Sequence, residues 1–401
     1  MRDPAAQPAG GGITEMDEME KIKDIRDIRQ AIDETDEELT KLLVQRLGLS
    51  GMVAEYKKDR GAAVQDGLRE REVLRQVAER SGEEYSKYTR IIYDTILDTS
   101  KAYQYSLMPA AGDFTGPIEE AIKGTPELFP ESAVVACQGI PGAHSEAAAM
   151  KMIPGAQLMY FSSFESVFSA VESGMCRYGV LPIENSNFGS IGEVYDMMRE
   201  HKFSIVRSTK HLVNQKLLAK PGVKLEEVKE IFSHEQALGQ CSRFLAGLEG
   251  VKVTASSNTA AAAKAVSESD RRDIAAISSE ECASLYGLEV IAGDIQVNNN
   301  NYTRFICISK DMQIYPGDTK ISLMLRVPHR PMSLYHTIGK ISTLGINICK
   351  LESRPFPGSD FEFTFYFDLD ASIRDPKVAR ALAELAAELD FFVFLGAYQE
   401  V

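Results

Sequence analysis

The sequence predicts a protein of three parts: an all-helical N-terminal segment, an α/β segment that divides into two lobes, and a small α+β module at the C-terminus. Apolar residues recur at helical spacing up to about residue 105. From residue 132, short β-rich runs alternate with helical stretches, and from about residue 320 the pattern is β-α-β-β-α-β. A length of 401 residues also suggests two or three domains.

The composition narrows the class of protein. The chain is 44% hydrophobic and 25% charged, as expected for a chain that can bury sizeable cores. A net charge of −14 argues against nucleic acid or an anionic membrane as the main partner. No apolar run approaches the roughly 20 residues of a membrane span, and Met1–Gly12 lacks the apolar centre of a signal peptide.

Cysteine and histidine spacing indicates the compartment and the metal content. The six cysteines lie far apart without a Cys-x-x-Cys pair, which is typical of reduced thiols in a cytoplasmic protein. The six histidines show no His-x-x-x-His or similar ligand spacing, so no metal site is predicted.

The N-terminal segment is predicted to form three helices, over Met16–Arg60, Leu68–Arg80 and Tyr85–Tyr105. Helices of such unequal length, the first near 60 Å at about 1.5 Å per residue, cannot close a core alone. We therefore expect this segment, assigned to residues 16–105, to dimerise.

Polar residues on these helices are the candidate site. Arg46 and Lys57 are 11 residues apart, which returns to nearly the same face at a separation of roughly 16 Å. Two long cations at that spacing can bracket a small dianion. Arg29 lies about 25 Å from Arg46 along the helix, so it would act from the partner chain. The other candidates are Asp66, Arg69 and Glu70 at the second helix, and Ser100 and Gln104 on one face of the third. The alternative is a solvated charged face.

Over about residues 20–105 this pattern resembles the all-helical chorismate mutase family. The resemblance implies that Arg29 (from the partner subunit), Arg46 and Arg69 hold the substrate carboxylates, and that Lys57 and Gln104 contact the ether oxygen. Glu70 and Asp66 would lie near the ring hydroxyl, and Ser100 would bind substrate. A pericyclic rearrangement needs no nucleophile; it needs a folded conformer and donors aimed at the developing charge.

Residues 106–131 contain several prolines and glycines and are predicted to be a linker with at most one short helix. Beyond it, one helix is predicted at Ala261–Ser267, after a cap at Ser257 or Asn258. The predicted strands are Val134–Cys137, Tyr178–Ile183, Ser204–Arg207, Glu230–Ser233, Val251–Ala255, Asp273–Ile277, Leu288–Ile291 and Phe305–Ile308.

In open α/β folds, ligands bind where strands end and helices begin. Four such junctions carry polar residues: Gln138–Ser145, Pro182–Ser186, Ser233–Gln236 and Asn301–Phe305. In the last, Thr303 offers a hydroxyl, and Arg304 is a fixed cation suited to gripping a carboxylate. Taken singly, each junction is equally compatible with a helix cap, a turn or an ordinary strand start.

Together, and in this order, the four motifs resemble prephenate dehydratase across residues 132–310. The resemblance implies two α/β subdomains of the periplasmic-binding type, with the site in the cleft between them. It implies catalysis centred on Thr303, in a pocket lined by Asn185, Ser186, Ser233, His234, Gln236, Gln240 and Arg304. This chain departs from the family at Gln215, where a histidine is common, and at Val297-Asn298. Because a threonine hydroxyl is too weak an acid alone, Thr303 is expected to act as donor or relay, with His234 as its partner and no cofactor.

The C-terminal module, residues 319–401, has predicted strands Ile321–Val327, Ile346–Ser353, Phe361–Asp368 and Phe391–Ala397, with helices Ser333–Thr343 and Pro376–Glu388. It resembles the ACT domain, a ferredoxin-like regulatory fold. Glu352, Ser353, Arg354 and Pro355 match the Glu-Ser-Arg-Pro motif of phenylalanine-inhibited dehydratases. The companion Gly-Ala-Leu motif is altered to Met332, Ser333 and Leu334, and loss of the glycine is expected to weaken or re-tune binding. The alternative is a dimerisation domain without ligand.

The whole chain thus resembles the bifunctional chorismate mutase–prephenate dehydratase family. The resemblance implies conversion of chorismate to prephenate and then phenylpyruvate in a homodimer or homotetramer, with feedback by L-phenylalanine. Alternatives are a prephenate or arogenate dehydratase whose helical segment only dimerises, and a non-catalytic amino-acid sensor. The short connection Ser309–Asp318 suggests that effector binding is felt at Thr303 and Arg304.

Overall fold

The computed structural model describes residues 24–60, 62, 64, 66–107, 114–298, 300–329, 332–356 and 362–401. It divides into two compact units, Met1–Pro109 and Ala110–Val401, which are described separately. In the described part of the chain, no helix is long and apolar enough to cross a membrane.

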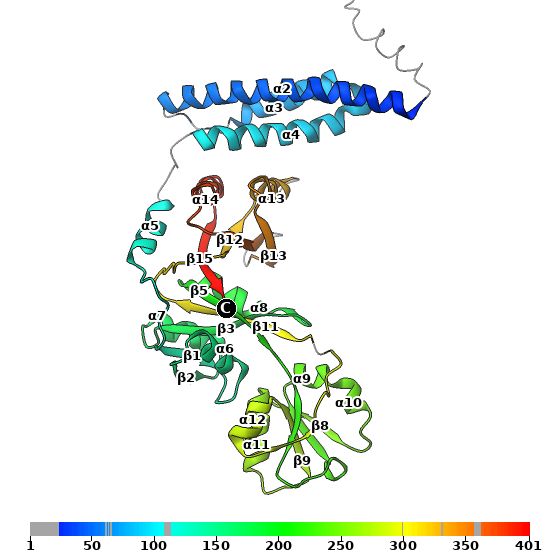
Figure 1. The fold of residues 1–401 in the computed structure, drawn as a ribbon, viewed down its shortest axis with the longest axis vertical. Helices are drawn as coiled ribbons and strands as arrows, with labels where there is room; N and C mark the ends of the chain where they lie inside the picture. The colour runs from blue at the N-terminus through cyan, green and yellow to red at the C-terminus, as the bar shows by residue number, and fades with distance from the viewer. Residues whose placement is uncertain are drawn as a thin grey trace, which may run out of the picture. The chain divides into compact units, whose positions relative to one another are not determined.

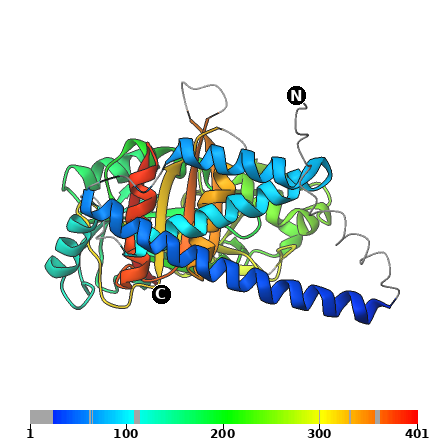
Figure 2. The same ribbon diagram turned by 90° about the horizontal axis from the view of Figure 1, so that it is seen from above.

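The first unit consists of α2 (Ile25–Arg60), α3 (Gly67–Arg80) and α4 (Gly82–Leu107), as the sequence predicts (Figure 1). The predicted start of the first helix, Met16 to Lys23, lies outside the described residues. The first turns of α2 extend beyond the ends of α3 and α4 in both views (Figure 2). They carry Arg29, which is exposed.

Few apolar residues of this unit are buried. Ala54 and Val77 are inside, but many large apolar side chains remain exposed on α2 and α4. These are Ile25, Ile28, Ile32, Leu39, Leu42, Val44, Leu49, Met52, Val53, Tyr56, Tyr85, Tyr88, Ile91, Ile92, Tyr103 and Leu107. The three helices of one copy therefore leave much of their apolar surface in water, at a cost of about 25 cal/mol per Å².

The second unit contains two lobes, each built on a sheet. The first-lobe strands are β1 (Val134–Gln138), β2 (Gln157–Phe161), β3 (Tyr178–Asn185), β4 (Gly189–Ser190), β5 (Ser204–Leu212) and β11 (Tyr302–Ser309), with helices α6 (His144–Met152), α7 (Phe164–Glu172) and α8 (Gly192–Glu200). Their order is β5-β11-β3-β1-β2, and β4 pairs with β3. The sequence prediction lacks β2, an edge strand that is only partly buried although Leu158–Phe161 is an apolar run.

The second lobe has the sheet order β10-β6-β9-β7-β8. Its strands are β6 (Lys216–Ala219), β7 (Glu230–Ser233), β8 (Lys252–Ala255), β9 (Ile274–Ser278) and β10 (Glu289–Ala292), and its helices are η1 (Leu225–Glu227), α9 (Glu235–Gln240), α10 (Ser242–Ala246), α11 (Thr259–Glu268) and α12 (Glu280–Tyr286). Asn258, one of the two predicted caps, accepts a hydrogen bond from the Ala261 backbone and begins α11. The chain enters this lobe after β5 and returns through β11, so these two strands connect the lobes.

The C-terminal module consists of β12 (Lys320–Arg326), α13 (Ser333–Thr343), β13 (Asn347–Pro355), β14 (Phe363–Asp370), α14 (Pro376–Glu388) and β15 (Phe392–Glu400). Both helices begin and end at the predicted residues. The module is not separate, however: Gln399 and Glu400 of β15 pair with Arg207 and Ser208 of β5, so its sheet continues into the first lobe.

The predicted linker holds one helix, α5 (Thr115–Gly124), and this helix packs on the C-terminal module. Ile118 is buried in the module's core, and the ring of Phe114 lies 5.5 Å from that of Phe392. The linker therefore belongs structurally to the module that is last in sequence.

Gly396 controls the join between the module and the first lobe. Its φ of +150° favours glycine, and a Cβ at this position would collide with the carbonyl oxygen of Ile205 on β5. We expect Gly396→Ala to lower the stability of the second unit by about 2–4 kcal/mol, because the two strands must separate. Calorimetric unfolding of the full chain measures this. Gly339→Ala is the control, since Gly339 in α13 has open space around it and should be neutral or slightly stabilising. Equal melting temperatures for the two variants would contradict the prediction.

Candidate active site

A cavity of about 560 Å³ lies between the two lobes of the second unit. The first lobe contributes the ends of β1, β3 and β11, and the second lobe contributes α9 and the start of α11. The lining residues are Gln138, Ala143, His144, Ser145, Phe164, Pro182, Asn185, Phe188, Gly189, Ser190, Ile191, Gly192, Glu193, Val213, Gln215, His234, Gln236, Ala237, Gln240, Ser257, Asn258, Thr259, Thr303 and Phe305. The volume suits a small organic molecule.

The electrostatic character of this cavity comes from its backbone. The first residues of α6, α8 and α11, and Gln236 near the start of α9, belong to its lining. Helix N-termini present unpaired N–H groups and partial positive charge, which attract carboxylates. Among the described lining residues there is no lysine or arginine, and Glu193 is the acidic side chain. Carboxylates are therefore attracted here by helix ends.

Thr303 is held by its neighbour on the adjacent strand. Asn185 of β3 pairs directly with Thr303 of β11, and its Nδ2 donates to Thr303 Oγ1 at 3.0 Å and to Asn301 Oδ1 at 2.8 Å. The side-chain oxygen Oδ1 of Asn185 in turn accepts hydrogen bonds from the backbone N–H groups of Asn187 and Phe188. Because Thr303 Oγ1 accepts from Asn185, its own hydrogen is directed elsewhere and can serve a ligand in the cavity.

The second lobe supplies amides. Gln236 and Gln240 line the cavity as predicted, and so does His234, whose Nδ1 accepts from the Gln236 backbone and caps α9. Gln215, where the sequence departs from the family pattern, also lines it. Its Nε2 donates to Gln240 Oε1 at 3.4 Å, and its buried Oε1 has no partner within the described structure. The sequence signal for Gln215 as a cavity residue is its position just after β5, a strand that connects the lobes.

Two predicted pocket residues have other positions. The Ser233 hydroxyl is fully buried and donates to the Ile277 carbonyl. The Ser186 hydroxyl donates to the Asn300 carbonyl at 3.0 Å and accepts from the Tyr302 backbone at 2.9 Å. Neither belongs to the lining. Both instead fix the backbone next to residues that do line the cavity.

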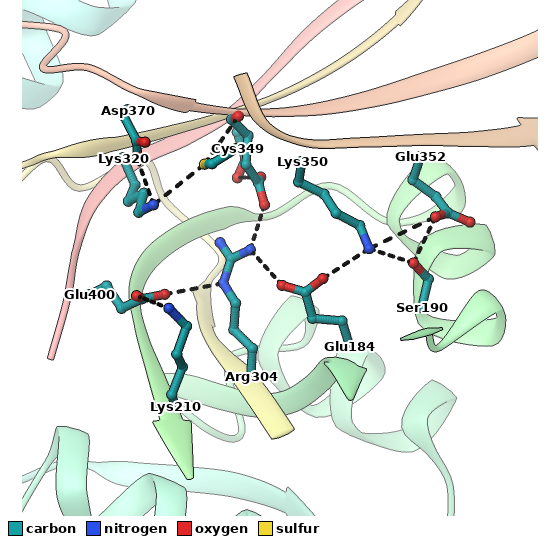
Figure 3. Close-up of polar contacts among 12 residues, drawn as sticks. Glu184, Ser190, Lys210, Arg304, Lys320, Cys349, Lys350, Glu352, Asp370 and Glu400 are labelled. Carbon is teal, nitrogen blue, oxygen red and sulfur yellow. Dashed lines mark hydrogen bonds and ion pairs between the residues drawn. The ribbon is translucent and has the colours of Figure 1, made fainter. Parts of the chain in front are cut away.

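Arg304 also departs from the prediction. Successive residues of a strand face opposite sides of the sheet, so Arg304 points away from the face that carries Thr303 and Phe305. Its side chain is only 7% exposed. Nη1 lies 3.2 Å from Glu184 Oε1 (Figure 3). Nη1 also lies 2.5 Å from Asp368 Oδ2, and Nη2 donates to Tyr398 Oη at 2.8 Å. The expectation that Arg304 grips a substrate carboxylate is therefore not met; it grips carboxylates of the protein.

This arrangement forms an ion cluster between the first lobe and the C-terminal module. Glu184 and Lys210 come from the lobe, and Lys350, Asp368 and Glu400 from the module (Figure 3). Burial opposes ionisation of Glu184, but the Lys350 ammonium and the Arg304 guanidinium hold its pKa below the ordinary 4.5. Ionised Glu184 therefore stabilises the fold above pH 4.5, and this contribution is lost as pH falls through the lowered pKa.

The predicted effector motif takes part in the same contacts. Ser190, which lines the cavity, donates to Glu352 Oε2 at 2.7 Å. Arg354 forms a bidentate pair with Asp196 of α8, with Nη2 at 2.7 Å from Oδ2. Ser353 lies between these two residues in β13, and Pro355 follows Arg354 as the last residue of the strand. Two residues of the motif thus reach the segment that forms one wall of the cavity.

The altered half of the effector motif begins α13. Met332 has a φ of +72°, the left-handed region that favours glycine. Ser333 and Leu334 are the first residues of the helix, and the Ser333 hydroxyl oxygen is buried without a partner in the described part of the chain. The predicted backbone position for a glycine is therefore present, although a methionine occupies it.

In the helical unit, some of the predicted residues come together. Arg46 Nη1 donates to Ser100 Oγ, across from α2 to α4. One turn later Gln104 is buried, and its Oε1 has no partner among the described residues. Lys57 reaches the Val64 carbonyl beyond the end of α2. Ser100 and Gln104 are buried, and Arg46 and Lys57 are partly buried.

The other predicted mutase residues have local partners. The Asp66 side chain caps α3 by accepting from the Arg69 backbone at 3.1 Å. The Arg69 guanidinium is exposed and pairs with Glu72. Glu70 pairs with Lys101 of α4 at 3.1 Å. Arg29 and Arg69 are thus not gathered with Arg46 in one copy of the chain.

Known protein families match both the α/β unit and the helical unit of this chain. The prephenate dehydratase family model matches residues 135–313, and the chorismate mutase type II model matches residues 28–105. An Arabidopsis thaliana protein, arogenate dehydratase/prephenate dehydratase 1, chloroplastic, is 38% identical over 280 residues, which cover 66% of this chain and 71% of that protein. The chain belongs to the prephenate dehydratase family.

Solved structures share the fold of the second unit. A prephenate dehydratase from Arthrobacter aurescens, in complex with L-Phe, is 29% identical with a TM-score of 0.61, over 66% of this chain and 89% of that one. A structure described as GqqA, a novel type of quorum quenching acylases, is 30% identical with a TM-score of 0.61, over 67% of this chain and 98% of that one. In this chain the family fold carries an additional mutase domain.

The buried position of Arg304 gives a stability prediction. Arg304→Lys keeps the charge but cannot contact Glu184, Asp368 and Tyr398 together, so buried carboxylates lose their partner. We expect a loss of about 3–5 kcal/mol in the free energy of unfolding. The control is Lys210→Met, because Lys210 pairs with Glu400 of the same cluster but its side chain is 56% exposed. That change should cost less than about 1 kcal/mol. Denaturant unfolding of both variants measures the two free energies of unfolding. Equal losses in Arg304→Lys and Lys210→Met would contradict the prediction.

Proposed function

We propose that the protein is a bifunctional enzyme that rearranges chorismate to prephenate and converts prephenate to phenylpyruvate, with feedback by L-phenylalanine. The single observation that carries the dehydratase part is the Thr303 hydroxyl, fixed by Asn185 and directed away from it at a cavity rimmed by helix N-termini. The match of residues 28–105 to the chorismate mutase model supports the other half. The unpaired cysteines favour the cytoplasm as its compartment.

The dehydratase cavity fits the chemistry of this substrate. Prephenate carries two carboxylates, and helix ends in a partly enclosed site attract them without cationic side chains. The reaction expels carbon dioxide and the ring hydroxyl, and aromaticity drives it. The protein must therefore hold the ring and assist departure of the hydroxyl oxygen, which is the role given to Thr303.

The mutase site requires a second copy of the chain. Arg46 and Lys57 lie on one face of α2 with Ser100 and Gln104 opposite, but Arg29 is exposed at the far end of the same helix. The exposed apolar residues of α2 and α4 support pairing of two copies, which would bring Arg29 from the partner subunit. A homodimer, or a homotetramer built from it, is thus part of the proposal.

Arogenate is a second candidate substrate for the dehydratase. Arogenate carries an ammonium group in place of the prephenate keto group, and Glu193 is the acidic side chain of a cavity without lysine or arginine in its described lining. The name of the Arabidopsis thaliana relative includes both activities. Parallel assays with the two substrates compare them directly, and Glu193→Gln should impair turnover of arogenate more than that of prephenate.

Feedback is proposed to travel through two contacts. Glu352 and Arg354 reach Ser190 and Asp196 beside the cavity. Asp368 and Tyr398 hold Arg304 directly behind Thr303. An effector that shifts the C-terminal module would therefore move both the wall of the cavity and the strand that carries Thr303. The L-Phe in the Arthrobacter aurescens dehydratase structure supports phenylalanine as that effector.

Two substitutions separate the activities. Lys57→Ala should lower chorismate mutase activity by about 100-fold or more, because a donor to the ether oxygen is lost. Thr303→Val should lower dehydratase activity by a similar factor, because the shape remains while the hydroxyl is removed. Assays with chorismate and with prephenate measure each step, and each variant is the folding control for the other. Accumulation of prephenate by the unaltered protein would contradict the dehydratase proposal, and an inert mixture would contradict both.

Phenylalanine titration tests the feedback path. We expect Asp196→Asn to weaken inhibition of the dehydratase by about fivefold or more, because the carboxylate that pairs with Arg354 is lost. Calorimetric binding of phenylalanine should be retained. Glu200→Gln on the same helix is the control, since Glu200 is exposed. Phenylalanine should also change hydrogen exchange in residues 301–308, and protection confined to the C-terminal module would exclude the path through Arg304.

A further inference from the structure

Two histidines meet at the wall of the cavity. His144, the first residue of α6, lines the cavity, and its Nδ1 lies 3.1 Å from Nε2 of His211 on β5. The ring centroids are 5.2 Å apart. One of the two nitrogens must carry a hydrogen and donate it to the other. The rings are therefore coupled, and the tautomer of one fixes that of the other.

This pair lies beside the catalytic threonine. In the register of β5 and β11, His211 is the direct partner of Thr303, as Asn185 is on the other side. Residues directly opposite in antiparallel strands project from the same face, with Cβ atoms about 5 Å apart. One face of the sheet thus carries the row Asn185, Thr303 and His211. Asn185 and Thr303 line the cavity, and His211 contacts His144, which also lines it.

The second nitrogen of His144 has no hydrogen-bond partner among the described residues. Its Nε2 is buried and lacks a hydrogen bond within the described structure. An unpaired buried polar atom costs about 1–3 kcal/mol, and a substrate group that reached Nε2 would remove that cost. Since Nδ1 is taken by His211, Nε2 is the atom of this ring that remains for a substrate.

We propose that His144 is a catalytic acid of the dehydratase and that His211 positions it and passes it a proton. This inference rests on the proposed dehydratase function. Thr303 orients the leaving hydroxyl by a hydrogen bond, and His144 supplies the proton that a threonine cannot. The pair takes the role that sequence analysis gave to His234.

The step balances as follows. In the complex, the pair holds one extra proton on His211. The bond between the ring and the carboxylate carbon breaks, and its electrons enter the ring. The opposite carbon–oxygen bond breaks, and its electrons leave with the oxygen. That oxygen takes the proton of His144 Nε2 and departs as water, while Nδ1 takes the proton of His211 Nε2. A prephenate dianion and one proton thus give carbon dioxide, water and a phenylpyruvate anion, and a solvent proton restores the pair.

Without substrate, the surroundings of the two histidines disfavour this extra proton. Burial and the neighbouring His211 lower the pKa of His144 to about 4, against the pull of Glu281. Burial also lowers the pKa of His211, where Glu281 of α12 favours and Lys151 of α6 opposes the charged form. Two substrate carboxylates in the cavity raise both values. The turnover rate should therefore fall as pH rises through the pKa of the pair in the complex.

Steady-state kinetics of the full chain test the proposal. His144→Phe should lower kcat with prephenate by about 100-fold or more, with a smaller change in KM. His144→Gln, which keeps a polar side chain of similar reach, should lose the fall of kcat at high pH together with most of the rate. His211→Gln should do the same to a lesser degree, and the double variant should be no worse than His144→Phe alone.

The mutase activity of the same chain and a histidine outside the cavity provide the controls. Mutase activity of each variant should stay unchanged, and His201→Gln, a histidine of the same lobe paired with Glu165 and Glu172 outside the cavity, should leave kcat within about threefold. A kcat within threefold of the unaltered protein in His144→Phe overturns the proposal, and so does an unchanged pH profile in His144→Gln. If the unaltered protein makes no phenylpyruvate from prephenate, the proposed function fails instead.

Discussion

The buried guanidinium of Arg304 is the constraint on which the second unit depends. It lies among Glu184, Asp368 and Glu400, so a single cation pairs with carboxylates of both the first lobe and the C-terminal module. A buried charge without its partners costs several kcal/mol. The lobe and the module can therefore separate or slide only if that cost is met. The residue that precedes Arg304 in the chain is the threonine of the cavity, so the same strand carries a structural bond on one face and a chemical group on the other.

The placement of Arg304 and Thr303 on opposite faces of the sheet also explains why the cavity lining is polar but not cationic. Cationic side chains that bind carboxylates tightly would hold the product anion as well as the substrate. Here the cations are used behind the sheet, and the cavity relies on helix ends, amides and hydroxyls. Such groups are fixed by the backbone, and little reorganisation is needed when charge moves during the reaction.

Much of this arrangement could be predicted from sequence, and the exceptions have physical causes. The helices of the C-terminal module follow from their periodicity and caps, and the motif residues Asn185, His234, Gln240 and Thr303 do meet at one cavity. A motif, however, groups residues by adjacency, whereas a strand sends neighbours to opposite faces. Arg304 was therefore assigned to the wrong side of the sheet. The sequence also predicts Ser186 and Ser233 in the pocket, because a hydroxyl that binds a backbone carbonyl has the same sequence signal as one that binds a ligand. His144 and His211 are 67 residues apart in sequence, and only the folded register brings them together.

The exposed apolar residues of α2 and α4 have a consequence for mass action. The second unit buries its main apolar clusters within one copy of the chain. The helical unit cannot bury its apolar faces within one copy, and part of its folding free energy is then a free energy of association. In one polypeptide, the specific activity of the dehydratase would then be independent of protein concentration, whereas that of the mutase would rise with it. Upon dilution the two activities would diverge, although they are encoded in a fixed ratio of one to one.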